Sequence, residues 1–233
     1  MQKEEIAVEA KNLTKQYGYF YGLKDASFQV ISGEIFGLFG PNGAGKTTLI
    51  RLIAALTHPT KGEAYVFGLN VKNEAEKIKE EIGILTDHSL LYDDLTGKEN
   101  LEFYLKMYGI HGKNEIEKKI DETTRILKVE DRLDDTVRTL STGLRRRFDI
   151  ARAIIHSPKL MLLDEPFSGL DVDSVNILKN FLIKHKGELT VIISTHNFDI
   201  AREICDRIAF LKKGKITEIV SKESYSQVKV ELM

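Results

Sequence analysis

The chain has 233 residues, of which 42% are hydrophobic and 30% are charged, and its formal net charge is −1. This balance predicts a globular chain with an ample core, and it excludes a broad positive field that would hold nucleic acid nonspecifically. The single cysteine, Cys205, excludes an internal disulfide framework and a multi-cysteine metal site, which suits a reducing compartment.

The start of the chain and its apolar segments show no sign of a targeting or spanning segment. Residues 1–6 lack the basic end and apolar centre of a signal peptide. No apolar stretch approaches the ~20 residues that are needed to span a bilayer. If a membrane takes part in the function, we expect another chain to supply the spanning segments.

The first strands are predicted from short apolar patterns that turn residues interrupt. Residues 6–10 and 26–30 are expected to form strands, and a turn follows at residues 32–33. Residues 35–39 form an apolar run that is typical of a buried strand.

A glycine-rich loop follows this run. Residues 40–48 read G-P-N-G-A-G-K-T-T and fit the pattern G-x-x-x-x-G-K-[ST] of a phosphate-binding loop. Residues 48–56 carry a helical pattern, and strand, loop and helix together present backbone N–H groups and a positive helix end to phosphate. The alternative is a chance match at a glycine-rich turn. The functional interpretation assigns nucleotide binding to Gly40, Pro41, Asn42, Gly43, Ala44, Gly45, Lys46, Thr47 and Thr48.

Residues of this loop have separate chemical roles in that interpretation. Gly43 and Gly45 can adopt φ > 0 and let the backbone approach a ligand closely. Lys46 can reach the outer phosphates as a point charge, and the Thr47 hydroxyl can ligate Mg²⁺.

The middle of the chain changes character. After a predicted strand at 63–68 and a short helix at 74–81, residues 97–150 carry helical patterns with charged residues on the opposite face. Gly109 and Gly112 bracket a break between two helices. The apolar stripes, which are expected to pack in a core, are Leu101, Leu105 and Tyr108 in one helix and Ile116, Ile120, Thr123 and Leu127 in the next.

Strands return in the last third of the chain. Residues 160–163 and 189–193 are predicted as apolar strands, and residues 208–211 and 215–219 as a final hairpin. Alternating strands and helices predict a mainly parallel sheet that is covered on both faces. The helical block at 97–150 interrupts this alternation and is interpreted as an inserted lobe.

Two carboxylates follow the first of these strands directly. Residues 160–165 read L-M-L-L-D-E, and ligands of a parallel sheet sit at the carboxyl ends of its strands. Asp164 is therefore expected to face the glycine loop and to ligate Mg²⁺, and Glu165 to orient or deprotonate a water molecule. The alternative is a strand that ends in solvated acids.

Further motifs occur in a fixed order along the chain. Residues 140–144 read L-S-T-G-L, residues 168–171 read S-G-L-D, residues 194–196 read S-T-H, and Tyr17 precedes the glycine loop. Together with the two phosphate-site motifs, they resemble the nucleotide-binding subunits of ATP-binding cassette (ABC) transporters over about residues 5–220. The segments that resemble the subgroup exporting drugs, sodium or haem are 58–62, 91–96 and 99–101.

The resemblance implies an α/β fold of the P-loop NTPase (RecA-like) type. It predicts a mainly parallel sheet core, an N-terminal antiparallel β subdomain and an inserted α-helical subdomain. The chain, 1–233, is expected to be a single ABC ATPase domain, with 1–86 and 151–233 forming the β subdomain and phosphate-loop core. Residues 87–150 are expected to form the helical subdomain that contains the signature.

The resemblance also implies an ATPase whose site is shared by two subunits that meet head to tail. The glycine loop of one subunit would face Ser141, Thr142 and Gly143 of the other, so that hydrolysis depends on dimerisation. The loop that carries Asp171 would cross the interface and couple the two sites.

Catalysis is assigned by the same resemblance to Glu165, His196 and Lys46. Tyr17 would stack on adenine, with a plain core aromatic as the alternative. A lone histidine at a strand end is more often structural, so the role of His196 depends on its place beside the other site residues.

The expected cofactors are ATP and Mg²⁺, with Thr47, Asp164 and Asp87 as metal ligands. The expected partners are a transmembrane permease on a separate chain and a second nucleotide-binding subunit, in a homodimer. No nucleic-acid partner is expected, because the arginine run 145–147 is short. The implied location is the cytoplasmic side of the cell membrane, peripheral through the permease.

Two positions depart from the family's pattern. Asp87 stands where glutamine is usual, and an ionised aspartate can ligate Mg²⁺ but cannot donate a hydrogen bond, which puts coupling to the membrane partner in question. Thr142 stands where glycine is usual, and a β-branched residue would be strained there if the position needed φ > 0.

Two other functions stay open at this stage. One is a soluble ATPase of the same fold that acts on ribosomes, DNA or cofactor assembly. The other is a regulatory sensor that binds ATP and barely hydrolyses it, for which Asp87 and Thr142 are the support.

Overall fold

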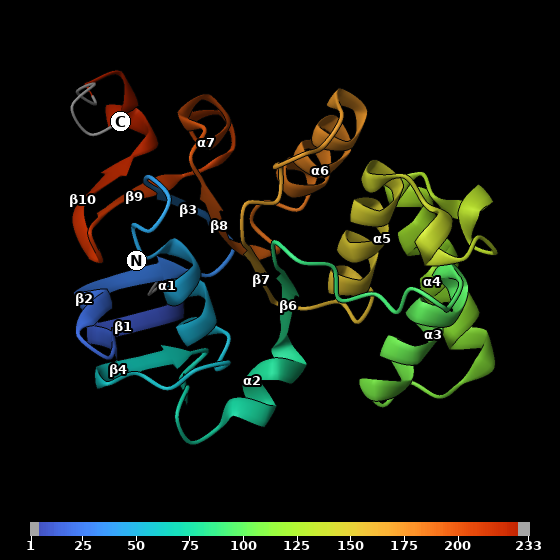
Figure 1. Cartoon of the computed structure of the whole chain (residues 1–233), viewed down its shortest axis with the longest axis horizontal. Helices are drawn as coiled ribbons and strands as arrows, with labels where there is room; N and C mark the ends of the chain where they lie inside the picture. Colours follow the sequence, from blue (N-terminus) through green and yellow to red (C-terminus); the bar gives the residue numbers. More distant parts are fainter. Residues whose placement is uncertain (1–4, 228–233) are drawn as a thin grey trace.

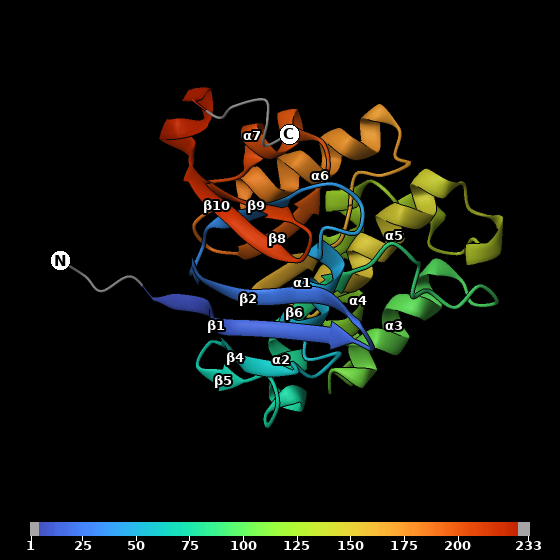
Figure 2. The same ribbon diagram turned by 60° about the vertical axis from the view of Figure 1, so that its left-hand side comes forward.

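The structure, a computed structural model, describes residues 5–227, and two β-sheets form its framework (Figure 1). The smaller sheet has the order β2-β1-β4-β5 and is antiparallel. Its strands are β1 (Ile6–Tyr17), β2 (Phe20–Ile31), β4 (Lys61–Val66) and β5 (Leu69–Asn70). The first two strands lie side by side in Figure 2 and are longer than predicted, because they pair up to the turn that joins them.

The larger sheet has the order β10-β9-β3-β8-β7-β6. Its strands are β3 (Ile35–Phe39), β6 (Ile82–Leu85), β7 (Leu160–Leu163), β8 (Thr190–Thr195), β9 (Arg207–Lys212) and β10 (Lys215–Ser221). Neighbouring strands are parallel except β9 and β10, which form the predicted hairpin. The edge strand β6 was not predicted, because its four residues include a glycine and are too few to show a pattern.

Helices surround the larger sheet and connect its strands. They are α1 (Lys46–Ile53), α2 (Ala75–Glu81), α3 (Gly97–Met107), α4 (Lys113–Leu127), α5 (Thr142–Ile154), α6 (Val172–Lys184) and α7 (Phe198–Ile204). Short 3₁₀ turns occupy Glu130–Arg132, Val137–Thr139 and Lys222–Gln227. The first helix begins at Lys46, two residues earlier than predicted, so the lysine of the glycine loop is the first helical residue.

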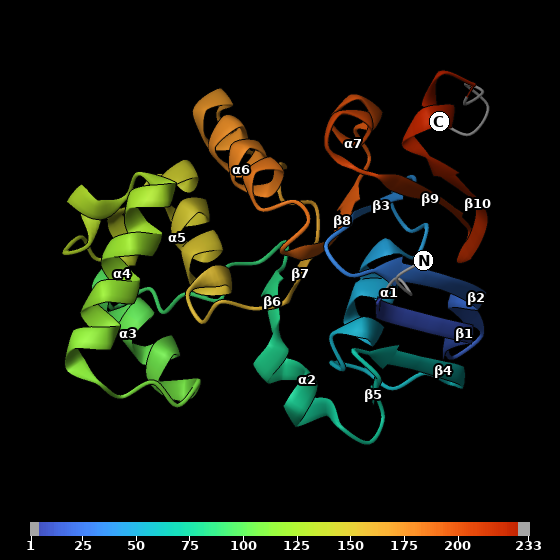
Figure 3. The same ribbon diagram turned by 180° about the vertical axis from the view of Figure 1, so that it is seen from behind.

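Helices α3, α4 and α5 form a lobe at one end of the molecule, away from the smaller sheet (Figure 3). Thr96 caps α3 and exchanges hydrogen bonds with Glu99, which gives this helix a defined start. The predicted apolar stripes Leu101, Leu105, Ile116, Ile120 and Leu127 are buried in one cluster. Helix α5 runs past residue 150, the predicted end of the helical subdomain, and ends at Ile154. The division of the chain into subdomains at 87–150 stays a prediction.

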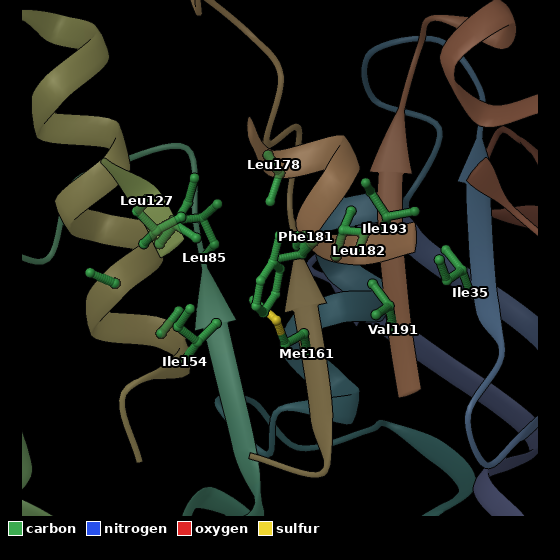
Figure 4. Packing of buried hydrophobic residues seen from close by; sticks show 14 of the residues in the cluster. Ile35, Leu85, Leu127, Ile154, Met161, Leu178, Phe181, Leu182, Val191 and Ile193 are labelled. Atoms are coloured by element: carbon green, nitrogen blue, oxygen red, sulfur yellow. The ribbon is translucent and has the colours of Figure 1, made fainter. Parts of the chain in front are cut away.

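Side chains of the larger sheet alternate between two cores. Met161 and Val191 face Phe181 of α6 on one side, as Figure 4 shows, and belong to the cluster that includes the lobe. Leu162 and Ile192 point the opposite way and pack with α1 and the smaller sheet. Because the strands are buried on both faces, they read as continuous apolar runs. The predicted mainly parallel sheet, antiparallel N-terminal sheet and helical lobe are all confirmed.

Candidate active site

The glycine loop joins β3 to α1 and borders a hollow of about 230 Å³. A Cβ atom on Gly45 would lie 2.5 Å from the carbonyl oxygen of Gly22, and one on Gly40 would lie 2.3 Å from that of Leu211. Gly45 has a φ of 109° and precedes α1 without a side-chain cap. The first N–H groups of α1 are therefore open to an anion in a cradle that admits only glycine at these two positions.

Lys46 is nearly buried, with 5% of its surface exposed, and its ammonium group has three oxygen neighbours. It donates hydrogen bonds to the carbonyl oxygens of Gly40, at 2.6 Å, and Pro41, at 3.3 Å. Its nitrogen also lies 3.1 Å from a carboxylate oxygen of Glu165. A buried ammonium group is costly unless it is paired, so phosphate oxygens would have to replace these contacts.

Asp164 and Glu165 are linked through the hydroxyl group of Ser194. This hydroxyl donates to Asp164 Oδ1 at 2.5 Å and accepts a hydrogen bond from the backbone N–H of Glu165 at 2.9 Å. Ser194 is fully buried near the end of β8, next to β7, which carries the two acids. The sequence analysis assigned Ser194 no role, although a polar residue near the end of an apolar strand was a usable signal.

Glu165 has a backbone conformation that is rare for this residue type, with a φ of 44°. Such a conformation stores strain and often marks a functional position. One carboxylate oxygen faces Lys46, and the other lies 3.0 Å from Nδ1 of His196. The structure thus brings the three predicted catalytic residues together, because β7, β8 and α1 all present their site residues at one end of the sheet.

The oxygen donors beside the loop suit Mg²⁺ that is bound together with phosphates and water. They suit a metal ion whose ligands all come from the protein less well. Thr47 contributes a hydroxyl group at the start of α1, and Asp164 a carboxylate at the end of β7. Residues 5–227 contain no cluster of three or more His, Cys, Asp or Glu side chains that could hold a metal ion. Mg²⁺ commonly uses one or two carboxylates and completes its shell with substrate phosphates and water, which matches this set.

Asp87 does not border the hollow of the glycine loop. It lies after β6, and its carboxylate accepts a hydrogen bond from the backbone N–H of His88 at 3.1 Å. It borders a second hollow, of about 410 Å³, which Glu165 and His196 also border. The two hollows share Asn42 and Glu165, so Asp87 faces the site from the side of Glu165.

Tyr17 stands beside the loop hollow rather than in its lining. Its ring stacks on Phe20, with centroids 5.5 Å apart, and a Cβ atom on Gly22 would lie 2.8 Å from it. Phe20 is 64% exposed and borders the hollow together with Tyr21. Phe20 was missed in the sequence analysis, since an aromatic residue in a hairpin has no distinguishing pattern.

The signature segment begins α5 and packs against the loop before α6. Ser141 caps α5, accepting a hydrogen bond from the N–H of Leu144 at 3.3 Å. A Cβ atom on Gly143 would lie 2.4 Å from Asp171 Oδ2, so any larger residue there would force the Asp171 side chain to shift. Asp171 in turn caps α6, and the hydrogen bond from the N–H of Ser174 lowers the pKa of its carboxyl group.

Thr142 is the first residue of α5 and is exposed. It is not among the residues with a positive φ angle. The strain considered for a β-branched residue at this position is therefore absent, because the backbone there is helical and the close approach occurs at Gly143 instead.

Comparisons with known proteins are consistent with this geometry. A family model described as "ABC transporter" matches residues 23–168, which is more than half of the chain. The chain is 37% identical to an uncharacterized ABC transporter ATP-binding protein, YhcH, of Bacillus subtilis, over 92% of this chain and 70% of that protein. It is 38% identical to the linearmycin resistance ATP-binding protein LnrL of the same organism, over 92% and 69%.

A solved structure with a similar fold carries reaction products. It is the dimeric post-hydrolysis state of an ATP-binding cassette bound to ADP and phosphate, with a TM-score of 0.86 and 30% identity. The match covers 92% of this chain and 98% of that one. None of the helices in residues 5–227 combines the length and apolar character that a membrane span requires.

Proposed function

This chain belongs to the ABC transporter family as an ATP-binding cassette with ATPase activity, and on that premise we propose that ATP-driven, head-to-tail dimerisation lets it energise a separate permease. The observation that carries the proposal is the meeting of Lys46, Glu165 and His196 beside a loop that admits only glycine at positions 40 and 45. Lys46 lies more than 100 positions before Glu165 and His196 in the sequence, yet all three residues share one end of the sheet.

The glycine loop and its lysine bind the triphosphate. The N–H groups at the start of α1 face the phosphate oxygens, and Lys46 moves from Glu165 to the outer phosphates. Tyr17 provides an aromatic face for adenine. Thr47 and Asp164, with Asp87 on the side of the second hollow, would hold Mg²⁺, which would supply positive charge to neutralise the phosphates.

Glu165 and His196 act on the attacking water. Release of Lys46 leaves the Glu165 carboxylate as a hydrogen-bond acceptor that orients the water and takes its proton. His196 donates to this carboxylate through Nδ1, which lies 3.0 Å from Glu165, and when both ring nitrogens carry a proton its Nε2 donates toward the outermost phosphate. Ser194 fixes the positions of Asp164 and Glu165 relative to β8, because its hydroxyl group is hydrogen-bonded to both residues.

The second cassette supplies the remaining contacts. Ser141 and the N–H groups around Gly143 lie at the start of α5, where a helix presents positive potential to an anion. In one chain these residues pack against the Asp171 loop rather than the glycine loop. This supports a signature that binds ATP held by the partner cassette, and the dimeric relative bound to ADP and phosphate supports the pairing of two cassettes.

An apolar groove of about 520 Å³ between α2, β6 and α3 supports a permease partner. Met107 and Leu56 border it, with 68% and 53% of their surfaces exposed. A short amphipathic helix on the cytoplasmic side of a permease fits such a groove, since it can bury an apolar face there. The name of the linearmycin resistance relative supports export as the direction of transport.

Dimerisation can be tested on the purified chain. Glu165→Gln should elute as a dimer in size-exclusion chromatography with Mg-ATP and as a monomer with Mg-ADP, because hydrolysis no longer reopens the pair. Adding Ser141→Arg, at an exposed position, should keep this variant monomeric. A Glu165→Gln chain that binds ATP and stays monomeric at every concentration contradicts the proposal.

The permease can be tested separately in membranes. The tagged chain should co-purify from detergent-solubilised membranes with a polypeptide that has several apolar spans. Met107→Glu should abolish this association while leaving ATP affinity unchanged, because Met107 borders the groove and does not border the loop hollow. Recovery of the wild-type chain only from the soluble fraction would favour a soluble ATPase.

A further inference from the structure

Strand β6 lies at the edge of the larger sheet and leaves one row of backbone groups without a partner strand. The carbonyl oxygens of Glu81 and Leu85 face β7, where they accept hydrogen bonds from Lys159 and Asp164 N–H groups at 2.9 and 2.8 Å. Backbone carbonyl groups of successive strand residues point to opposite sides of the strand. The carbonyl oxygens of residues 82, 84 and 86 therefore point away from β7, toward the open edge of the sheet.

Three side chains from α5 and the turn after it meet this row. Nε2 of His156 lies 3.0 Å from the carbonyl oxygen of Ile82, Arg152 donates to that of Ile84, and Arg146 donates to that of Thr86 at 2.6 Å. We call these three side chains the donor ladder. It takes the place of a further strand and joins the helical lobe to the sheet, where Figure 1 shows α5 beside β6.

The close fit between helix and strand depends on Gly83. A Cβ atom at this position would lie 2.1 Å from the carbonyl oxygen of Ala153. The backbones of α5 and β6 therefore approach more closely than any side chain would allow. This close approach lets the side chains of the donor ladder reach the carbonyl oxygens of the β6 segment. The lobe and the sheet edge are therefore joined by three side-chain contacts.

Asp149 extends the same attachment beyond the strand. Its Oδ1 accepts hydrogen bonds from the hydroxyl group of Ser89 and the N–H of Leu90, both at 3.1 Å. Asp149 is 2% exposed, and its burial raises the pKa of its carboxyl group. Arg146 is hydrogen-bonded to Thr86 and Asp149 to Leu90, so α5 is attached to the chain on both sides of Asp87. We call these hydrogen bonds of Arg146 and Asp149 the grip of α5.

This grip lies close to the signature. Thr142 and Arg146 are one helical turn apart on α5, and both border the second hollow with Asp87 and Glu165. A helix moves as a rigid body over one turn. A displacement of the signature therefore displaces Arg146 and Asp149, and with them the segment that carries Asp87.

We propose that Arg146 and Asp149 are positioning residues for hydrolysis, which hold the Asp87 segment in fixed register with the signature helix. Docking of the partner's ATP on the signature then sets the place of Asp87 relative to Glu165 in the chain's own site. The catalytic part of this inference rests on the proposed function. The grip itself is a property of the single chain and can be measured without nucleotide.

The sharpest test compares Arg146→Met, which cannot donate, with Arg146→Lys, which can. Arg146→Met should lower kcat by roughly ten- to a hundredfold, since small misplacements in an active site have effects of this size. Its ATP affinity should stay within about twofold of wild type, because Arg146 does not border the loop hollow. Arg146→Lys should restore most of kcat.

Hydrogen exchange of the nucleotide-free chain gives an independent measurement. Amides of residues 86–90 should exchange faster in Arg146→Met and in Asp149→Leu than in wild type. Asp149→Asn keeps an acceptor oxygen for Ser89 and Leu90 and should behave like wild type. Arg138→Met removes an exposed arginine of the same lobe, which pairs with Asp94, and is the matched control for lost charge.

Several outcomes would overturn the inference. Unchanged exchange at residues 86–90 in both Arg146→Met and Asp149→Leu would show that the grip does not hold this segment. Faster exchange with a normal kcat would remove the positioning role, as would an equal loss of kcat in Arg138→Met. A wild-type chain without any ATP hydrolysis would instead overturn the proposed function, and the catalytic part of this inference with it.

Discussion

The Lys46 ammonium group and the Glu165 carboxylate lie 3.1 Å apart, although 119 positions separate them in the sequence. Lys46 begins α1, which follows β3, and Glu165 follows β7. The two residues meet because β3 and β7 both run parallel to β8 in one sheet. The pair joins the residue proposed to hold the phosphates to the residue proposed to activate water. If these two proposed roles hold, nucleotide binding and activation of Glu165 are linked, since Lys46 cannot contact the phosphates fully while it is paired.

The first prediction concerns Glu165→Gln. Turnover should fall by roughly 10²–10⁴-fold, because an amide cannot take a proton from water. ATP affinity should rise, since the neutral side chain competes less for Lys46. Steady-state phosphate release and an ATP titration measure the two effects. Glu76→Gln, at an exposed position on α2, is the control. Near-normal turnover in Glu165→Gln would remove the role given to this residue.

Lys46→Ala should weaken ATP binding by roughly ten- to a hundredfold. Hydrogen bonds from a charged donor contribute about 1.5–3 kcal/mol each, and every 1.4 kcal/mol corresponds to a tenfold change in Kd. Fluorescence titration with a labelled ATP analogue measures this loss, and thermal unfolding shows whether the variant is folded. A folded variant with unchanged affinity would contradict the assignment of the loop.

Ser194→Ala tests the hydroxyl group that links the two acids. Its loss leaves the buried N–H of Glu165 without its acceptor and Asp164 without its donor. The free energy of unfolding should fall by about 1–3 kcal/mol, and kcat should fall as well, while Ser194→Thr keeps the hydroxyl group. Urea denaturation and phosphate release measure both. Equal stability and turnover in wild type and Ser194→Ala would show that this link is dispensable.

Gly143→Ala should disturb the loop before α6, because the added carbon would lie 2.4 Å from Asp171 Oδ2. A steric clash of this kind lowers stability by about 1–3 kcal/mol. The same substitution in an Asp171→Ala background should cost less, since the clashing oxygen is gone. A double-mutant cycle of unfolding free energies measures this coupling. Strict additivity would show that the two residues do not interact.

His156 should make stability depend on pH between about 4 and 6.5. Burial lowers the pKa of this ring from 6.5 to about 4. In that window the unfolded chain binds a proton that the folded chain does not, so stability is complete above pH 6.5 and falls as the pH is lowered. The loss should reach about 3 kcal/mol at most.

Urea denaturation at pH 7, 5.5 and 4.5 checks this dependence. His156→Gln should show a shallower loss of stability on acidification, while retaining an amide donor for the carbonyl oxygen of Ile82. His58→Gln, which changes an exposed histidine, should follow the wild-type curve. Identical pH profiles for wild type and His156→Gln would assign the acid sensitivity to other groups.

Local patterns were enough to predict the segments that meet in the candidate site. The glycine loop and the acids after β7 could be recognised because each is a short segment whose chemistry is complete in itself. The helical stripes of α3 and α4 were predicted for the same reason, since a helix buries residues that recur every three or four positions. The edge strand β6 was missed, because four residues carry no period and its partners come from β7 and α5.

The sequence by itself determined the phosphate loop, the strand-end acids, the signature segment and the alternation that builds a parallel sheet. Tertiary structure alone decided that Ser194 links Asp164 to Glu165, that Lys46 is paired with Glu165, and that α5 holds the chain around Asp87. The reason is physical: the first set depends on neighbours within a few residues. The second set depends on which strand ends and helix faces meet in space, and packing over the whole chain decides that.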